Sequence, residues 1–264
     1  MPLPVEVVTY DFGNTLVRVD RASSRAVAAA SAAAVKRAGI VDDETAYLAV
    51  WAEERDRQFR EEVPNLREVD LAQRVVRVLA RLRGTVAPPP DARWDDAAAA
   101  ALIRPGEVDA AVAAYSTAFV DTMQPEPEAG PHLERMRARG YRMAVLSNWP
   151  LAATIDAFVE AQGWAPLFDA IVVSQRVGAI KPHADIFRAA ANQLGASADR
   201  IIHVGDDWAA DVVGARAAGW HVAYLRDRQS DTPLPTSAPG GDVRADLMID
   251  RLTDLEPLIE PWSP

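Results

Sequence analysis

The stretch VVTYDFGNTLVRVD, from Val7 to Asp20, decides the fold class of this chain. It opens with a short apolar run rich in β-branched residues, which is typical of a buried strand. The run meets a single acid, Asp11, and then turns through Gly13 and Asn14. A carboxylate between an apolar strand and a Gly-Asn-Thr turn indicates a functional site more than an acid that only caps a helix.

Further short aliphatic segments follow and alternate with helical patterns. Each segment is bounded by polar residues or glycine, as strands usually are. The predicted strands are Val5 to Tyr10, Tyr141 to Leu146, Ala170 to Val173, Arg200 to Val204, His221 to Leu225 and Leu247 to Ile249. The predicted helices are Pro131 to Arg139, Leu151 to Gln162, Ala184 to Leu194, Ala209 to Ala218 and Asp254 to Ile259. This alternation predicts an α/β fold with a mostly parallel sheet covered on both faces.

Residues 19 to 123 interrupt the alternation. They hold no convincing strand, and their stretches rich in alanine and arginine favour helix. A chain of 264 residues is long enough for a core domain that carries a smaller insert. We therefore predict an α/β core domain from residues 1–18 and 124–264, with an inserted helical domain from residues 19–123.

The composition indicates a folded, acidic protein. Hydrophobic residues make up 49% of the chain, and the formal charge of −10 disfavours nucleic acid and anionic membranes as partners. The absence of cysteine excludes disulfides, a thiolate nucleophile and a zinc–thiolate site. We expect a cytoplasmic protein without a leader or a membrane span, present as a monomer or homodimer.

Polar side chains follow several of the predicted strands. In an open parallel sheet the carboxyl ends of the strands share one edge, where loops and helix N-termini meet a ligand. These side chains can therefore converge although they are far apart in sequence. They are Asp11, Ser147, Asn148, Lys181, Asp206, Asp207 and Asp211.

These residue types favour nucleophilic displacement assisted by a metal. One carboxylate can attack while others hold Mg²⁺, and hydroxyl, amide and ammonium groups can hold an anion. Several acids so close would repel one another, and a divalent cation is the simplest way to keep them ionised. Lys181 supplies the remaining positive charge.

Four motifs in order resemble those of the haloacid dehalogenase superfamily, in its phosphatase branch. DFGNTL at Asp11 resembles the nucleophile loop, and VLSN ending at Asn148 resembles the second motif. IKP at Lys181 resembles the third motif, and VGDDWAAD from Val204 resembles the fourth. The resemblance implies a Rossmann-like, doubly wound core, with the helical insert as a cap that follows the first motif.

The resemblance implies catalytic roles for four residues. Asp11 would attack phosphorus and form an aspartyl phosphate. Ser147 and the backbone of Asn148 would hold the phosphoryl oxygens, and Lys181 would balance the charge. The implied activity is Mg²⁺-dependent hydrolysis of small phosphomonoesters, with sugar phosphates among the candidates.

The resemblance also implies a metal site. Asp11, the backbone carbonyl of Gly13 and the Asp206 carboxylate would bind Mg²⁺ directly. Asp207 and Asp211 would support the ion or orient the loop, although an acid at position 211 also suits the first turn of a helix.

Gly13 departs from the pattern of the family. Most phosphatases of the superfamily carry a second aspartate two residues after the nucleophile, and it acts as general acid and base. Glycine keeps the backbone carbonyl but lacks that carboxylate, which is typically worth about 10²–10⁴-fold in rate. A subset of sugar-phosphatase-like members also has Asp-x-Gly-Asn at this place, and a leaving group that needs little protonation, such as a sugar 1-phosphate or an acyl phosphate, would suit it.

Two other functions stay open from the sequence. One is a non-catalytic binding or regulatory module with the same fold, and the other is a 2-haloacid dehalogenase, which also lacks the second aspartate. The Gly-Asp-Asp pattern at Asp206 argues against the dehalogenase, because displacement of halide from carbon needs no metal. A phosphonate-cleaving relative would need a lysine in the insert, where only Lys36 occurs.

The histidines have no predicted role as metal ligands. His203 lies within a predicted strand, so we expect it to be a packed core residue.

Overall fold

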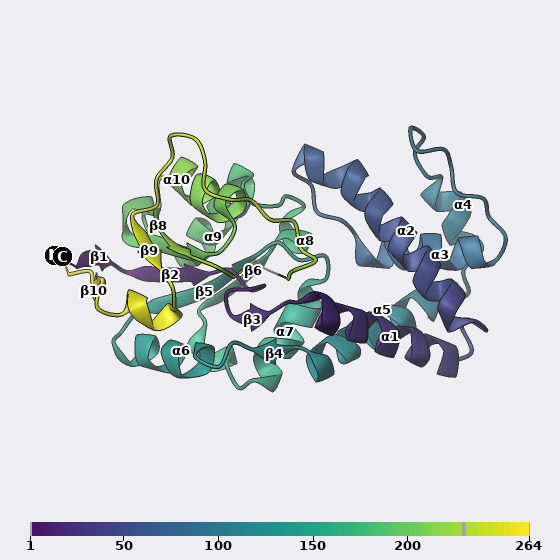
Figure 1. Cartoon of the computed structure of the whole chain (residues 1–264), viewed down its shortest axis with the longest axis horizontal. Helices are drawn as coiled ribbons and strands as arrows, with labels where there is room; N and C mark the ends of the chain where they lie inside the picture. The colour runs from purple at the N-terminus through teal and green to yellow at the C-terminus, as the bar shows by residue number, and fades with distance from the viewer. Residues whose placement is uncertain (1, 229–230, 264) are drawn as a thin grey trace. The chain divides into compact units, whose positions relative to one another are not determined.

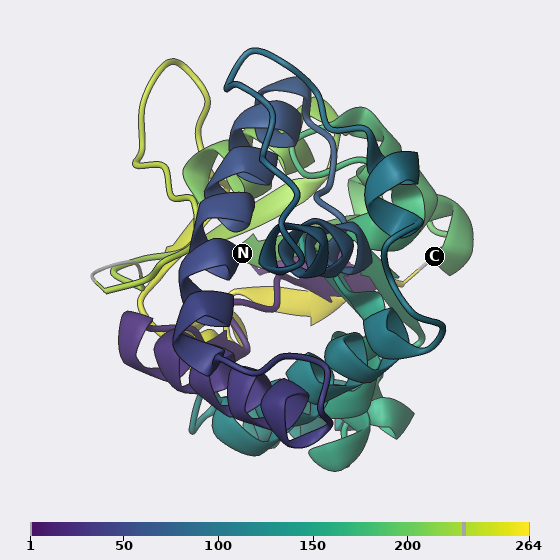
Figure 2. The same ribbon diagram turned by 90° about the vertical axis from the view of Figure 1, so that its right-hand side faces the viewer.

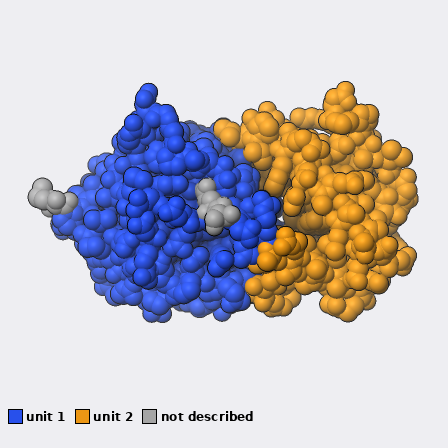
Figure 3. Space-filling view, in the orientation of Figure 1, with its two compact units in different colours: residues 1–21, 123–264 blue, residues 22–122 orange. Residues whose placement is uncertain are grey.

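The computed structural model describes residues 2–228 and 231–263. The chain divides into two compact units, shown in different colours in Figure 3. Residues 1–21 and 123–264 form the first, which we call the sheet unit. Residues 22–122 form the second, which we call the helical unit.

The sheet unit is built on a parallel sheet. Among the described residues six strands pair in the order β6-β5-β2-β7-β8-β9, and every neighbouring pair is parallel. In chain order the strands are β2 (Val7–Tyr10), β5 (Arg142–Ser147), β6 (Ala170–Val173), β7 (Ile201–Gly205), β8 (His221–Leu225) and β9 (Leu247–Ile249). The prediction of an α/β fold with a parallel sheet is confirmed.

Helices cover both faces of this sheet. Figure 1 shows α9 and α10 on one face and α6 and α7 on the other. On the first face, Ile186 and Phe187 of α9 pack with Leu146, Val212 and Trp220 into one buried cluster. The helices of the unit are α6 (Ala129–Ala138), α7 (Ala152–Ala161), α8 (Ser174–Val177), α9 (Ala184–Leu194) and α10 (Gly214–Ala217), with single 3-10 turns η2 (Ala165–Leu167), η3 (Ala198–Arg200) and η5 (Leu252–Leu255).

The two ends of the chain differ from prediction. The first predicted strand is divided into β1 (Leu3–Val5) and β2, and β1 pairs in parallel with β10 (Ile259–Pro261). The predicted helix from Asp254 to Ile259 is therefore wrong, since only the 3-10 turn η5 forms before β10. Pro257 cannot donate to a helical ladder, and pairing with β1 gives the following residues an alternative.

The predicted helix from Ala209 to Ala218 begins irregularly. Its first part is a π-helical turn, η4 (Trp208–Val213), and only Gly214–Ala217 is α-helical. Asp207 caps the turn through a hydrogen bond from the Ala210 amide. Turns of this kind are frequent at functional sites, and this one carries Asp211 directly beyond β7.

The helical unit contains α1 (Arg21–Arg37, whose first residue belongs to the sheet unit), α2 (Glu44–Glu62), the 3-10 turn η1 (Val63–Asn65), α3 (Leu71–Leu82), α4 (Asp96–Ala100) and α5 (Glu107–Thr122). Helices α2 and α3 pack side by side (Figures 1 and 2). Acids immediately before α2, α3 and α4, at positions 43, 70 and 95, accept hydrogen bonds from backbone amides of the first turn. No helix in the described part of the chain is both long and apolar enough to cross a membrane.

Next to the boundaries between the units, β3 (Val17–Arg18) and β4 (Gln124–Pro125) form an antiparallel pair. This pair ties together the two segments of the sheet unit that flank the helical insert.

Candidate active site

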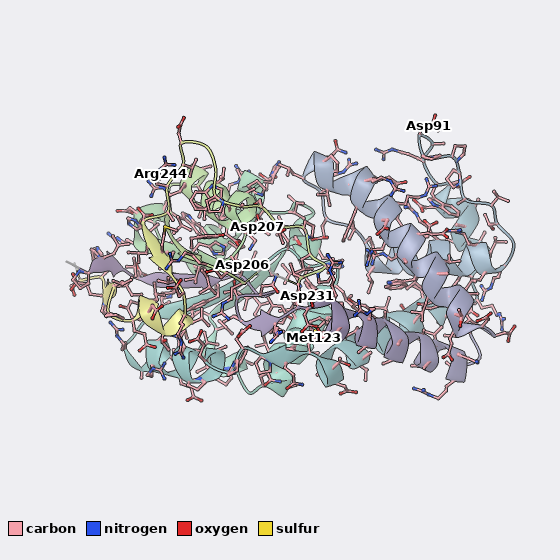
Figure 4. All side chains as sticks on the ribbon, viewed as in Figure 1. Asp91, Met123, Asp206, Asp207, Asp231 and Arg244 are labelled. Carbon is pink, nitrogen blue, oxygen red and sulfur yellow. The ribbon has the colours of Figure 1, made fainter. Side chains whose placement is uncertain are left out.

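The carboxyl ends of two adjacent strands bring three acids together. One carboxylate oxygen from each of Asp11, Asp206 and Asp211 lies within 4.8 Å of the other two. Asp11 follows β2, and the other two follow β7, the strand next to it. Figure 4 labels Asp206 beside Asp207 at the end of β7. Asp206 and Asp211 are buried, whereas the Asp11 side chain keeps 15% exposure and is the most accessible of the three.

Lys181 is the cation of this cluster. Its Nζ lies 2.8 Å from Oδ1 of Asp11 and 2.7 Å from Oδ1 of Asp211, and it also donates to the carbonyl of Leu146 at 2.8 Å. Burial disfavours the ammonium form, but the two carboxylates outweigh burial and raise the pKa of Lys181 above its usual range. Lys181 therefore stays charged.

Lys181 does not neutralise the cluster. Burial raises the pKa of Asp11, and the Asp211 charge adds to this rise, although Lys181 opposes it. For Asp211, burial also acts to raise the pKa, but Lys181 and His203 outweigh it and the net direction is downward. The surrounding protein groups therefore stabilise the negative charge of Asp11 less than that of Asp211.

Asn148 fixes the backbone of Lys181. Its Oδ1 accepts from the Lys181 amide at 2.7 Å, and its Nδ2 donates to the Lys181 carbonyl at 3.1 Å. The neighbouring Ser147 ends β5 and is 1% exposed. Within the second motif, the Asn148 side chain therefore positions the backbone of the third motif.

The Asp207 carboxylate does not belong to the cluster of three acids. Its Oδ1 accepts from the Ala210 amide and from the Ser237 hydroxyl, each at 2.7 Å, and its Oδ2 accepts from the Ser237 amide at 2.7 Å. Its carboxylate thus joins η4 to the segment that follows β8.

The segment Asp231–Gly240, which we call the post-β8 segment, contacts the loops of the site. The hydroxyl of Thr232 accepts from Nδ2 of Asn14 at 3.2 Å, and Nε1 of Trp208 donates to the Gly240 carbonyl at 3.1 Å. Figure 4 labels Asp231 at the start of this segment. Its sequence, DTPLPTSAPG, is rich in proline, serine and threonine, which is typical of a surface loop.

Gly13 lies under this segment. A Cβ at position 13 would be 2.9 Å from Cδ1 of Leu234, 3.6 Å from Val19 and 4.0 Å from Trp149. The side chain that most of the superfamily carries here would contact these apolar side chains, and the end of Leu234 would have to move. The neighbouring Phe12 packs edge to face on Trp149 and Phe158, with ring centroids 6.1 and 5.5 Å apart, which fixes the loop that carries Asp11.

Gly205 permits the close approach of Asp211. A Cβ at position 205 would be 2.2 Å from Cγ and Oδ2 of Asp211, so no larger residue fits without moving that carboxylate. Oδ2 of Asp211 in turn accepts from the Asp207 amide at 2.8 Å. The Gly-Asp-Asp pattern thus has a steric basis at its first position.

Two residues of the site have contacts that the sequence pattern did not indicate. His203 is buried as expected, but its Nε2 lies 3.0 Å from Oδ1 of Asp211 and its Nδ1 lies 2.8 Å from the Thr9 hydroxyl. Because a carboxylate can only accept, Nε2 carries the proton of this neutral ring. The Thr15 hydroxyl donates to Oδ1 of Asp206 at 3.3 Å. The sequence signal for these contacts is a polar residue among apolar ones: Thr9 and Thr15 in VTYDFGNT, and His203 in RIIHVGD.

The donor set fits a hard divalent cation. Three carboxylates converge, one ammonium offsets part of their charge, and carboxylate oxygen is the ligand that Mg²⁺ prefers. Oδ1 of Asp211 is already shared by Lys181 and His203, so Asp11 and Asp206 are the better placed ligands.

Comparison with known sequences gives one family. The profile described as haloacid dehalogenase-like hydrolase matches residues 5–219. Ribulose-1,5-bisphosphate 5-phosphatase of Halopiger xanaduensis is 31% identical over 158 residues, which are 59% of this chain and 65% of that protein. The chain spans between about half and two thirds of the length of the curated relatives that match it first.

Two solved structures show the same fold. The 2-haloacid dehalogenase of Pseudomonas syringae aligns with a TM-score of 0.62 at 20% identity, over 96% of this chain and 97% of that one. The HAD-hydrolase YfnB of Bacillus subtilis, solved with magnesium bound, aligns with a TM-score of 0.58 at 16% identity, again over 96% and 97%. At such identities the likeness concerns the fold alone.

Proposed function

The chain belongs to the haloacid dehalogenase-like hydrolases, and from this premise we propose that it is a Mg²⁺-dependent phosphatase of small phosphomonoesters. The observation that carries the proposal is the cluster of Asp11, Asp206 and Lys181, in which an accessible carboxylate lies beside a second acid and a buried ammonium. The similarity to a phosphatase of ribulose 1,5-bisphosphate supports a small phosphorylated substrate, with sugar phosphates among the candidates.

In the proposed reaction an oxygen of Asp11 attacks the phosphorus of the substrate. A P–O bond forms to Asp11, the ester P–O bond breaks, and the leaving alkoxide takes a proton from water. Water then attacks the phosphorus of the aspartyl phosphate. This step breaks the P–O bond to Asp11, releases inorganic phosphate and restores the Asp11 carboxylate. The proton lost by the attacking water neutralises the hydroxide left when the alkoxide was protonated, so one water in all is consumed for each ester cleaved.

The metal would be held by Asp11, the backbone carbonyl of Gly13 and Asp206. Bound Mg²⁺ would offset the charge of the phosphoryl oxygens and keep the neighbouring acids ionised. Asp211 would act by position, since its oxygens already hold Lys181, His203 and the Asp207 amide. Asp207 would support the site through the turn that it caps and through its contacts with the post-β8 segment.

Lys181 and the second motif would hold the phosphoryl group. The Ser147 hydroxyl and the backbone amide of Asn148 would donate to the phosphoryl oxygens. The Lys181 ammonium would offset the charge that passes from Asp11 to the phosphoryl oxygens. Positioning and charge stabilisation would supply most of the rate gain, as in phosphoryl transfer generally.

Gly13 sets the range of substrates in this proposal. Since position 13 offers no carboxylate, the leaving group has to depart with little help from a general acid. Acyl phosphates and sugar 1-phosphates, which give stable leaving groups, would therefore be cleaved faster than alkyl phosphates. The same absence would slow the attack of water on the aspartyl phosphate.

We also propose a role for the helical unit and a cellular location. The helical unit would act as the cap that selects substrate, because it is inserted after the first motif. A cytoplasmic location and the absence of nucleic-acid partners agree with the charge of −10 and the lack of cysteine.

A phosphate-release panel tests the function. Acetyl phosphate, glucose 1-phosphate, ribulose 1,5-bisphosphate and p-nitrophenyl phosphate are each assayed with Mg²⁺ and with EDTA, and Asp11→Asn is the control. We expect release that requires Mg²⁺ and Asp11. No release above the Asp11→Asn background, with ligand binding retained, would favour the non-catalytic module. Halide release from a 2-haloacid in the presence of EDTA would favour the dehalogenase.

A further inference from the structure

Arg74, on α3, is buried in the helical unit without an ion-pair partner among the described residues. It is 4% exposed, and its Nη2 is buried and makes no hydrogen bond there. Nε donates to Oε1 of Gln58 at 2.9 Å, which is a neutral acceptor. Burial lowers the pKa of Arg74 to about 10. A buried guanidinium with an open donor is unfavourable unless something offsets it.

The other arginines of α3 are paired. Arg77 contacts Asp96 at 2.8 Å and Glu61 at 2.9 Å, and Arg81 contacts Glu53 at 2.6 Å and Glu54 at 3.0 Å. Glu54 is itself buried, so the helical unit contains a buried acid that pairs with Arg81. Arg74 is the exception on this helix.

Aromatic rings surround the guanidinium. Its Cζ lies 5.2 Å from the ring centroid of Trp51 and 6.0 Å from that of Phe59. The Trp51 ring stacks on Tyr115 and also packs against Tyr47, with ring centroids 5.8 Å apart in both pairs. The Tyr47 hydroxyl is buried without a hydrogen-bond partner in the described part of the chain. Two polar groups in one aromatic cluster thus have unused hydrogen-bonding capacity.

Charges of both signs act on Arg74. Burial has the largest effect on the Arg74 pKa, and Tyr115 has the second largest. The positive charge of Arg55 comes third and lowers this pKa. Glu68 acts in the opposite direction, but its Oε1 accepts from the Val69 amide at 2.8 Å. Arg55 itself pairs with Asp56, at an exposed position.

We propose that Arg74 and the Tyr47 hydroxyl bind an oxyanion, a carboxylate or phosphate group of a small organic molecule, against the rings of Trp51 and Tyr115. A guanidinium edge matches two oxygens of such a group, and a phenol hydroxyl supplies a further donor. Cation–π contact alone would leave both Nη2 and the Tyr47 hydroxyl without a partner.

The oxyanion can come from two sources. It can be a second charged group on the substrate, which rests on the proposed phosphatase activity, or it can belong to a separate small anion, which does not. The binding experiment below needs no turnover, so its failure is distinct from failure of the proposed function.

Binding is tested on the full-length chain in EDTA with malonate as the probe. Thermal unfolding and calorimetric titration compare the wild type with Arg74→Met, Arg74→Lys and Tyr47→Phe. Arg93→Met is the matched control, because Arg93 is exposed in the same unit. We expect malonate to raise the melting temperature of the wild type and the control, and Arg74→Met to weaken binding by about tenfold or more. Arg74→Lys keeps the charge without the planar edge, so we expect it to restore binding only in part, and Tyr47→Phe to weaken binding by a smaller factor.

Equal binding to the wild type and Arg74→Met would overturn the proposal, as would no binding to either. Kinetics then identify the source of the oxyanion. Phosphoglycolate, which carries a carboxylate, is compared with p-nitrophenyl phosphate, which does not. If the oxyanion belongs to the substrate, the preference for phosphoglycolate in kcat/KM falls about tenfold in Arg74→Met, through a higher KM, and is unchanged in Arg93→Met. If malonate binding is lost while this preference stays constant, the ligand is a separate anion.

Discussion

Leu234 occupies the space beside the Cα of Gly13. A Cβ added at position 13 would lie 2.9 Å from Cδ1 of Leu234, which is closer than two carbons normally approach. Thr232 accepts a hydrogen bond from Asn14, and its hydroxyl also accepts from the Leu234 amide at 3.2 Å, so the segment that carries Leu234 is attached to the nucleophile loop. A side chain at position 13 would therefore require the end of the half-buried Leu234 side chain to move.

Gly13→Asp should consequently fail to restore a general acid. We expect the carboxylate to push the end of the half-buried Leu234 side chain aside at a cost of about 0.5 kcal/mol or less in unfolding free energy, without a gain in kcat while Leu234 competes for the same space. The double variant Gly13→Asp/Leu234→Ala makes room, and its kcat for an alkyl phosphate should exceed that of Gly13→Asp by about 10-fold or more. Urea unfolding and phosphate release measure the two effects, with Leu234→Ala as the control. A single variant Gly13→Asp that is faster than the wild type would show that Leu234 does not keep the carboxylate out of place.

Lys181→Met should destabilise the protein, because it removes the ammonium between two buried carboxylates. The expected cost is about 3–5 kcal/mol in unfolding free energy, as for other broken buried ion pairs. Mg²⁺ should then raise the melting temperature of the variant more than that of the wild type, since the ion becomes the remaining compensating cation. Thermal unfolding at several Mg²⁺ concentrations tests this, and an equal Mg²⁺ effect on both proteins would count against a metal held by these acids.

Gly205→Ala should disrupt the site by steric means alone. The new methyl group would overlap the Asp211 carboxylate, which lies 2.2 Å from the Cβ position. Asp211 would have to leave Lys181 and His203, with a loss of stability of several kcal/mol. Gly240→Ala is the matched control, because its Cβ would come no closer than 3.9 Å to the Ala238 carbonyl. Similar urea midpoints for the two variants would refute this explanation of the glycine.

Stability should fall as the pH drops below the ordinary histidine pKa. Burial lowers the pKa of both His132 and His203, although Glu256 and Asp211 respectively oppose this. The unfolded chain then binds protons more readily than the native chain, so the histidines favour the native state above about pH 6.5 and this contribution is lost on acidification. The free energy of unfolding in urea, measured at about pH 7.5 and pH 5.5, should decrease, and the decrease should be smaller in His132→Gln. A value that rises on acidification would contradict the sign.

The parts of the fold that could be predicted are those in which local pattern and tertiary structure agree. The apolar runs before Asp11, Ser147 and Asp206 could only be buried strands, and parallel strands bring their carboxyl ends to one edge. The helix expected from Asp254 to Ile259 failed because the pairing of β10 with β1 joins segments from opposite ends of the chain. The residue pattern within either segment gives no indication of this pairing.

Contacts at the site that depend on tertiary structure could not be predicted from the sequence pattern. Asp11, Ser147 and Asp206 could be selected because each ends a strand, but the contact of His203 with Asp211 depends on the sharp turn of η4. The position of Leu234 depends on where a long connection returns. Loops of this kind have no periodicity from which contacts can be inferred.

The central claim is that Asp11 becomes phosphorylated during turnover. Rapid acid quenching after mixing with acetyl phosphate and Mg²⁺, followed by peptide mass analysis, tests it directly. We predict one phosphoryl group on the peptide that contains Asp11, absent in Asp11→Asn and absent when EDTA replaces Mg²⁺. Release of inorganic phosphate at an undiminished rate in Asp11→Asn, with no phosphorylated peptide at any time point, would contradict the claim.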